Sequence, residues 1–321
     1  MKTEDYSSGI LMQLIASSFE RQDIWRQLPA HLNEFRRPKA PHVQLSLKRE
    51  LLAEVFLNWG AAPIIQAGFD IRRMPDSPLS FTLLKAASVT ELLERFFKLQ
   101  RYFHSKHRVQ LIKQEENTVS LWHMSKNEGK PERYEDLLIA GLVAGMLSQF
   151  GCSSVKLIID NATVIMDEEV QKAFLPPKDC SRFVISWGET IIPDRFTSAE
   201  VLNGFRNFTA TGSGRISGKI GEVVASDPVR KWSVKTVADR FGLSSRTLQR
   251  RLKEEGTTFG DCILAARCQC GAYFITQKIE NLTAVGFLCG FSDAAHFSRE
   301  FKRNMGILPS QFQESISSDH G

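Results

Sequence analysis

The sequence lacks the short motifs that mark many enzymes. It has no glycine-rich phosphate loop after a predicted strand, no GxSxG turn, no HExxH signature and no Cys/His pair at zinc spacing. His104 and His107 lie close together along the chain, but no partner residues for a metal ion accompany them, and two partly exposed histidines are the plainer interpretation. The sequence therefore predicts no enzyme activity, no metal site and no cofactor.

Long apolar runs are also missing. The longest one, residues 137–147, is too short to cross a bilayer and predicts the core of a buried helix. Near the start of the chain, Glu4 and Asp5 precede a brief apolar run broken by Gln13, which makes a poor secretory signal. We therefore expect a cytoplasmic protein with no membrane partner.

Cysteine is scarce, with 6 residues among 321 and no regular spacing, which predicts reduced thiols and argues against a disulfide framework. Cys262, Cys268 and Cys270 fall close together in a predicted helix. A thiol sensor or a metal site is an alternative there, but buried structural cysteine is the commoner case.

The net charge of +5 is unevenly distributed. Residues 228–313 contain 13 Lys and Arg against 7 Asp and Glu, so this part of the chain carries the whole positive excess. A basic C-terminal region is what a nucleic-acid partner would require, although the charge alone does not establish one.

Composition divides the chain in two. Residues 209–219 are rich in Gly, Ser and Thr and have no apolar periodicity, which predicts a linker. We expect a first domain at residues 1–208 and a second domain at residues 220–321.

The first domain has the pattern of an α+β fold. Helical periodicity, capping residues and strand alternation each occur in it more than once. Its aromatic residues can line a ligand pocket, but aromatics at helical spacing more often form core. The expected helices lie at residues 47–59, 88–103, 134–150 and 167–174, the expected strands at 109–111, 119–121, 155–159 and 182–187, and the aromatic set is Phe96, Phe97, Phe103, Trp122 and Phe150.

One stretch near the C-terminus occurs twice. Residues 238–253 are echoed by residues 286–302, and each copy predicts a helix, a sharp turn at Gly242 or Gly290, and a second helix that carries basic residues. This order of elements predicts two helix-turn-helix units in an all-α domain, each able to place its second helix in a major groove.

The caps and the connection support the repeat. Ser244 and Ser292 are each positioned to cap the helix that follows the turn. The spacing of the buried residues shows that the second copy carries one extra residue just after its turn. The expected bounds are about 233–254 for the first unit, about 258–277 for a long connecting helix, and about 281–304 for the second unit.

Spacing also predicts which side of each second helix faces DNA. In the first helix-turn-helix unit, Leu248 and Leu252 form the buried face of the second helix. Residues three and four positions apart on the other side therefore share its exposed face. Arg can bind guanine and Gln can bind adenine with two hydrogen bonds each. The exposed set is Arg246, Thr247, Gln249, Arg250 and Lys253, of which Arg246, Gln249 and Arg250 have the chemistry to read bases, while Arg251 and Lys253 are better placed to contact phosphates.

The second helix-turn-helix unit offers fewer side chains that can read bases. Phe297 and Phe301 form its buried face. Ala295 can offer thymine only a methyl contact, whereas His296 and Arg299 can hydrogen-bond base edges or phosphates. The outward set is Ala295, His296, Arg299 and Arg303, with Lys302 to one side.

These two segments, SSRTLQRRLKEEGTTF at 244–259 and GFSDAAHFSREFKR at 290–303, resemble the signatures of the AraC/XylS family of bacterial transcription regulators. The resemblance covers about residues 215–313. It implies that the base-facing positions are Arg246, Thr247, Gln249, Arg250, Ala295, His296 and Arg299. It also implies that Arg267, at a basic position on the connecting helix, belongs to the DNA-binding set.

The chain departs from the family pattern at a few positions. Gly286 stands where the family usually has Ala, which should weaken that helix by roughly 1 kcal/mol. Residues 307–308 and 311–313 also differ from the family's usual ending, so contacts at the last turn are not carried over.

The first domain resembles the sensing domain of the ornithine- and arabinose-type regulators, and no residue in it matches a ligand motif. The resemblance implies a transcription activator that binds double-stranded promoter DNA and recruits RNA polymerase. Its first domain would bind a small-molecule effector or mediate homodimerisation. Two alternatives stay open: a DNA-binding enzyme or repair protein with a sacrificial thiol at Cys152 or Cys180, and an RNA-binding or architectural protein.

Overall fold

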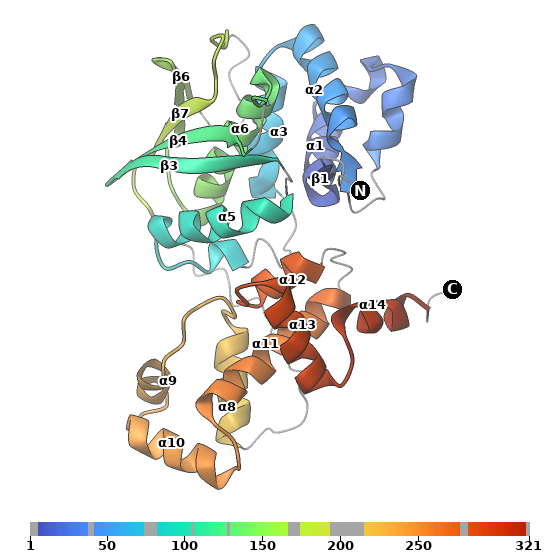
Figure 1. Ribbon diagram of the computed structural model, residues 1–321. Helices are drawn as coiled ribbons and strands as arrows, with labels where there is room; N and C mark the ends of the chain where they lie inside the picture. Colours follow the sequence, from blue (N-terminus) through green and yellow to red (C-terminus); the bar gives the residue numbers. More distant parts are fainter. Residues whose placement is uncertain are drawn as a thin grey trace. The chain divides into compact units, whose positions relative to one another are not determined.

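The computed structural model describes residues 6–37, 42–73, 82–103, 106–126, 129–165, 174–192, 215–276 and 282–318. Contacts divide the chain into two compact units, and each is described by itself (Figure 1). The first unit is Met1–Ser77 with Ala86–Pro193, and the second is Pro78–Lys85 with Asp194–Gly321. No helix in the described ranges has the length and apolar character needed to span a bilayer.

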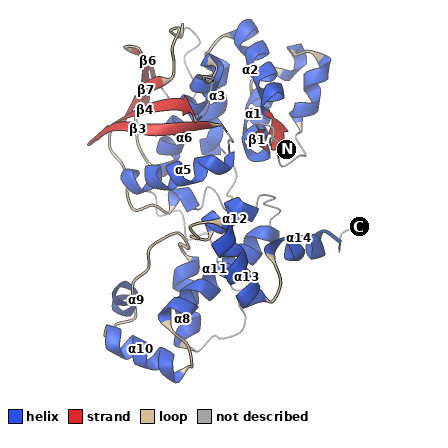
Figure 2. Ribbon diagram, viewed as in Figure 1, coloured by secondary structure: helices blue, strands red, loops and turns tan. Residues whose placement is uncertain are grey.

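The first unit mixes helices and strands, which confirms the expected α+β class (Figure 2). The expected helix at 167–174 lies outside the described residues. The elements are β1 (Tyr6–Ser8), α1 (Gly9–Arg21), 3-10 turns at Trp25–Gln27 and Ala30–Arg36, β2 (His42–Gln44), α2 (Leu45–Trp59), α3 (Ala62–Phe69), a 3-10 turn at Asp70–Arg73, α5 (Val89–Phe103), β3 (His107–Glu115), β4 (Thr118–Ser125), α6 (Arg133–Phe150), β5 (Lys156–Ile159), β6 (Ala162–Ile165) and β7 (Arg182–Ser186).

A five-stranded antiparallel sheet has the order β3-β4-β7-β5-β6, and β1 pairs separately with β2. The expected strands at 109–111 and 119–121 lie within β3 and β4, which form an antiparallel hairpin with Val119 opposite Gln114 and a bulge between Leu111 and Lys113. The last strand, β7, inserts between the β3–β4 and β5–β6 hairpins, pairing with both β4 and β5. The sheet therefore joins segments that are far apart in the sequence.

Helix α6 is the core helix that the apolar run at 137–147 predicts. It begins with a capping box of Glu132 and Glu135 and ends at Gly151, whose backbone is left-handed. A Cβ atom added at Gly141 would lie 2.1 Å from the carbonyl oxygen of Ile65 in α3. The backbones of α3 and α6 are therefore in direct contact, and any side chain at Gly141 would force them apart.

The second unit is helical throughout its described part. Its elements are α8 (Ile216–Ala225), α9 (Val234–Arg240), α10 (Ser245–Glu254), α11 (Phe259–Thr276), α12 (Leu282–Leu288), α13 (Ala294–Met305) and α14 (Pro309–Ser318). We call α9 with α10 the first helix pair and α12 with α13 the second helix pair. Figure 1 shows α8 and α11 between the two pairs.

The described part of the predicted linker is mostly helical. Helix α8 begins at Ile216, inside the 209–219 segment that we expected to lack structure, and residues 209–214 lie outside the described residues. The carboxylate of Glu255, just after α10, accepts hydrogen bonds from the backbone N–H groups of Ile216 (2.7 Å) and Ser217 (3.0 Å). The start of α8 is thus capped by a side chain distant in sequence, which local patterns do not reveal.

One predicted cap is correct and the other is wrong. Ser244 accepts a hydrogen bond from the backbone N–H of Thr247 at 3.1 Å, as expected. In the second pair, however, the cap is Asp293 and not Ser292: the Asp293 carboxylate accepts from the backbone N–H of His296 at 2.7 Å. The extra residue after the second turn moves the cap along by one position, and Asp caps a helix as well as Ser does.

The structure also gives a reason for the unusual Gly286. An added Cβ atom would lie 3.0 Å from Cβ of Phe297, and one added at Gly271 in α11 would lie 2.9 Å from Cε2 of the same residue. Phe297 is 1% exposed, so its ring is enclosed against the backbone of two helices. This close packing offsets the loss of helix propensity that a glycine brings.

The two turn glycines predict a measurable contrast in stability. Both have a left-handed backbone, with φ of 64° at Gly242 and 81° at Gly290. A Cβ atom at Gly242 meets nothing within 4 Å, whereas one at Gly290 would lie 2.4 Å from the carbonyl oxygen of Pro228. We expect Gly242→Ala to cost about 1–2 kcal/mol for the backbone conformation alone and Gly290→Ala to cost about 1–3 kcal/mol more because of the overlap.

Hydrogen exchange of peptides from residues 215–318, measured in the full chain over a urea series, gives the two free energies of unfolding. Equal losses for the two variants would contradict the close contact at Gly290.

Candidate nucleic-acid interface

Helix α10 presents the exposed face that its spacing predicts. Leu248 and Leu252 are buried, at 0% and 1% exposure. The polar residues on the other side are exposed, and they come from a helix held by contacts with α8 and α9. The exposed set is Arg246, Gln249, Arg250, Arg251 and Lys253. This face has the guanidinium and amide donors needed to bind base edges and phosphates.

Thr247 is the exception on α10. It is half-buried, and its hydroxyl lies 2.8 Å from Oγ of the capping Ser244. Its backbone N–H donates to the same serine. Thr247 therefore contributes to the start of the helix as well as to its surface.

An ion pair occupies Arg250 in the free protein. Its guanidinium donates to Glu254 one turn later at 2.8 Å, and the two side chains are 66% and 58% exposed. An exposed pair of this kind stabilises a helix by less than about 1 kcal/mol. Arg250 can therefore exchange this partner for a guanine or a phosphate at little cost.

Helix α13 presents a weaker face. Ala295, Arg299 and Lys302 are exposed, whereas the ring of His296 is half-buried and meets the Phe291 ring edge-on, with centroids 5.3 Å apart. Arg303 is exposed but donates to Asp261 of α11 at 3.1 Å. Two of the expected contacts are thus engaged within the protein.

Arg267 lies apart from both exposed faces. Its guanidinium is partly buried and donates to the backbone carbonyl oxygens of Pro228 (2.9 Å) and Arg230 (3.3 Å). The family resemblance includes Arg267 among the DNA-contacting set, but the structure does not bring it together with the other predicted contacts.

Charge is concentrated on one half of the second unit. Residues 215–256 contain 10 Lys and Arg against 5 Asp and Glu, whereas residues 257–318 contain 5 of each. Because attraction to the phosphate backbone depends on such cations, the α8–α10 half has the charge that long-range attraction to DNA would require.

Comparison with known proteins agrees with this geometry. A family model described as a helix-turn-helix domain matches residues 237–315. The transcriptional activator CfaD of Escherichia coli is 30% identical over 96 residues, which are 30% of this chain and 36% of CfaD. The dual transcriptional regulator Rns of Escherichia coli is 29% identical over 96 residues, again 36% of its length.

Residues 237–315 form a helix-turn-helix domain of the AraC/XylS type. The proteins matched over this domain are transcription regulators and not enzymes. The chain spans about a third of the length of these curated relatives, and each match covers 30% of this chain. Among solved structures, the regulator CdpR of Pseudomonas aeruginosa aligns over 94% of this chain and 97% of its own, at 15% identity and a TM-score of 0.32, too low to establish a shared fold.

The cysteines of the first unit do not have the surroundings of reactive thiols. Cys152 and Cys180 are 4% and 0% exposed. Burial raises the pKa of Cys152 to about 11 and that of Cys180 to about 12. A thiol attacks as its thiolate, so these pKa values oppose the repair-protein alternative.

The aromatic set of the first unit contributes mainly to the core. Phe96 and Phe150 are buried, whereas Phe97 and Trp122 are half-buried. The side chain of Phe103 lies outside the described residues. These positions fit the core interpretation better than the ligand-pocket interpretation.

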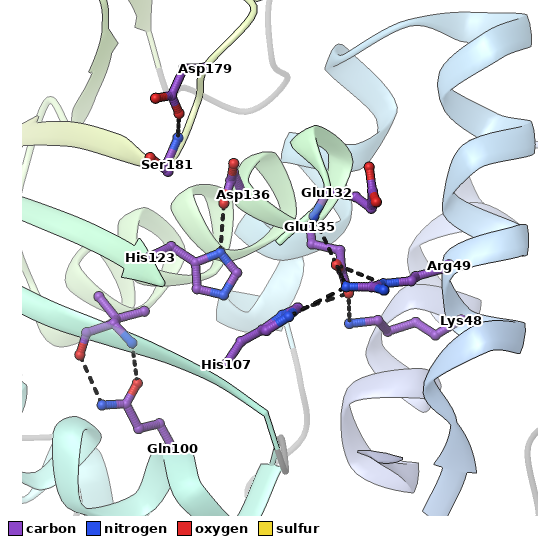
Figure 3. A network of polar contacts seen from close by, with 11 residues as sticks. Lys48, Arg49, Gln100, His107, His123, Glu132, Glu135, Asp136, Asp179 and Ser181 are labelled. Atoms are coloured by element: carbon purple, nitrogen blue, oxygen red, sulfur yellow. Dashed lines mark hydrogen bonds and ion pairs between the residues drawn. The ribbon is translucent and has the colours of Figure 1, made fainter. Parts of the chain in front are cut away.

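One of the two histidines singled out in the sequence lies in a different environment from the one we expected. His107 is 2% exposed and belongs to a buried polar network (Figure 3). The interpretation of a partly exposed histidine is therefore wrong for His107. His104 lies outside the described residues. The rings of His107 and His123 meet edge to face at 5.2 Å. In the described part of the chain, no three acidic, His or Cys side chains are grouped to hold a metal ion.

Glu135 is the centre of this network. Its carboxylate forms ion pairs with Nζ of Lys48 at 2.8 Å and with the guanidinium of Arg49 at 2.9 Å, and these pairs connect α6 to α2. Burial alone would raise the pKa of Glu135, but Lys48, His107 and Arg49 outweigh it and hold this pKa well below its usual range. The carboxylate is therefore ionised, and removal of either cation would leave a buried charge with fewer partners.

His123 and Asp136 form the second part of the network, with Nδ1 and Oδ1 2.8 Å apart. Burial lowers the pKa of His107 and of His123 to about 3. Burial, with the charges of Asp179, Glu135 and Glu132, raises the pKa of Asp136 to about 8. Both shifts favour the neutral forms, so near neutral pH a protonated carboxyl of Asp136 is hydrogen-bonded to the neutral imidazole of His123.

These pKa shifts predict a stability maximum for the first unit. Unfolded imidazoles bind a proton near pH 6.5 but the folded ones only near pH 3, so acidification through this window favours unfolding. Asp136 loses its proton near pH 4 when unfolded but near pH 8 when folded, so a rise in pH through that window also favours unfolding. Below about pH 6.5 the two unfolded histidines bind more protons than the single proton that folded Asp136 retains, so the free energy of unfolding falls as the pH is lowered. Above that pH the effect of Asp136 is the larger one, which places the stability maximum at about pH 6.5.

Urea unfolding at about pH 5, 6.5 and 8 tests this expectation. Tryptophan fluorescence is a suitable probe because, among the 5 tryptophans, only Trp232 lies outside the first unit. Asp136→Asn keeps a hydrogen-bond donor for His123 and should abolish the alkaline loss while retaining the acid loss. An unchanged alkaline loss in this variant would contradict the protonated Asp136.

Proposed function

We propose that this chain is a one-component transcription regulator that binds promoter DNA through α10 and α13. The observation that carries the proposal is the exposed face of α10, where three arginines, a lysine and a glutamine stand on a helix capped by Ser244 and packed through Leu248 and Leu252. The match of residues 237–315 to a helix-turn-helix family supports it.

In this proposal the two helix pairs are two helix-turn-helix units, and α11 is the connecting helix between them. Each pair has a glycine turn with a left-handed backbone and a side-chain cap at the start of its second helix. Helix α10 would read bases with Arg246, Gln249 and Arg250, and would hold phosphates with Arg251 and Lys253. Helix α13 would add Ala295, Arg299 and Lys302.

The first unit would control the second. Its role would be to bind an effector or to mediate dimerisation, and the bound state would favour the arrangement that is competent for DNA. Activation through RNA polymerase is inferred from the relatives, several of which are named activators. A regulator of this kind acts on DNA in the cytoplasm.

The division between base-reading and phosphate-binding residues can be tested on α10. Arg250→Ala should lower the affinity for a selected site by about 1–3 kcal/mol and relax the base preference within one block of it. Lys253→Ala should weaken binding to all duplexes similarly and reduce the salt slope by about 1. Fluorescence anisotropy over a salt series separates the two, and the same sequence-independent loss in both variants would refute the assignment.

Selection of duplexes from a random pool tests the proposal as a whole. The full chain and residues 215–321 alone should both enrich a motif of two blocks about one helical turn apart. Enrichment by neither protein would contradict direct promoter binding by this chain in the absence of an effector. A single block that survives in both would instead leave α13 without a role in base recognition.

A further inference from the structure

Arg267 joins two parts of the second unit that are distant in sequence. It lies near the middle of α11, and its Nε donates to the carbonyl oxygen of Pro228 at 2.9 Å. A terminal nitrogen of the same guanidinium donates to the carbonyl oxygen of Arg230 at 3.3 Å. Both acceptors belong to the turn between α8 and α9, so a side chain of α11 holds the turn that leads into the first helix pair.

That turn is itself firmly attached to the first helix pair. The indole Nε1 of Trp232 donates to the carbonyl oxygen of Asp227 at 2.9 Å, and the backbone N–H of Trp232 donates to Arg230 at 3.0 Å. The guanidinium of Arg240, the last residue of α9, lies over the Trp232 ring at 4.9 Å from its centroid. Any displacement of this turn is therefore transmitted to α9 and, through it, to α10.

The second helix pair meets the same place. A Cβ atom added at Gly290, in the turn between α12 and α13, would lie 2.4 Å from the carbonyl oxygen of Pro228 and 3.0 Å from Cζ of Arg267. The α8–α9 turn, which leads into the first helix pair, and the α12–α13 turn of the second pair thus converge on one guanidinium. An arginine is suited to this role because its planar fork can donate to two carbonyl oxygens at fixed angles, which the ammonium of lysine cannot reproduce.

We propose that Arg267 is a positioning residue that fixes the spacing between α10 and α13, and that it does not bind a DNA phosphate. This inference rests on the proposed function, because it concerns how one chain reads two blocks of a promoter. Loosening the junction would allow the two recognition helices to adopt a range of separations, so that the protein would tolerate altered spacing between the blocks.

The test compares Arg267→Lys with Lys253→Ala in the full chain. Binding is measured for the duplex enriched from the random pool and for duplexes with one base pair inserted or removed between the blocks. We expect Arg267→Lys to weaken binding to the enriched duplex by about tenfold, corresponding to the loss of one or two good hydrogen bonds. It should also shrink the penalty for altered spacing and leave the salt slope unchanged.

Lys253→Ala should behave in the opposite way, with a salt slope lower by about 1 and an unchanged spacing penalty. If Arg267→Lys instead lowers the salt slope by about 1 and keeps the spacing penalty, Arg267 binds a phosphate and the proposal is wrong. Trp232→Phe, which removes the indole donor but keeps an aromatic ring, should tolerate altered spacing in the same way as Arg267→Lys.

Hydrogen exchange without DNA separates this proposal from the proposed function. In Arg267→Lys, peptides covering residues 227–233 and 286–292 should exchange faster than in the unsubstituted chain, while peptides from residues 244–256 should not change. No change in the first two peptides would overturn the positioning role. Failure to enrich any duplex would count against the proposed function alone, because the exchange result does not depend on DNA.

Discussion

Close packing against the backbone of glycine residues is the constraint on which both units depend. In the first unit the absence of a side chain at Gly141 lets α6 rest on the carbonyl oxygen of Ile65 in α3. In the second, Gly271 and Gly286 let two helices close around Phe297. Helices packed at such distances cannot slide without overlap, and so the elements that they carry stay in fixed positions. Helix α13 is held in this way through its own Phe297.

The sequence predicts the parts of this structure that are locally encoded. Helix α10 has a capping Ser244, a Leu248–Leu252 pair and a polar opposite face, and all three signals lie within ten residues of one another. The cap of α13 was misassigned because Ser292 and Asp293 are adjacent and both can cap, so that only the geometry of the turn decides. The short strand β6 and the helix α1 were missed because their patterns are brief or interrupted.

Contacts between distant segments account for what the sequence does not reveal. A lysine at position 48 predicts an exposed residue, yet Lys48 is 2% exposed because Glu135 supplies its counter-charge. Similarly, the positive charge of Arg267 suits a contact with DNA, but its guanidinium donates to the carbonyl oxygens of Pro228 and Arg230. In both cases the partner lies far along the chain, and no local period relates the two residues.

Under the proposed function, the two helix pairs would contribute unequally to DNA binding. Residues 215–256, which contain α10, carry all of the net positive charge of residues 215–318, so they would provide most of the attraction to phosphates and most of the salt dependence. The half that contains α13 is neutral, and its Arg303 is already engaged by Asp261. Such a half adds little to affinity at a distance, but it adds discrimination once α10 is seated, provided that its position relative to α10 is fixed. The junction at Gly290 and Arg267 supplies that fixed position, which is why a rigid connection matters more to the second helix pair than an additional cation would.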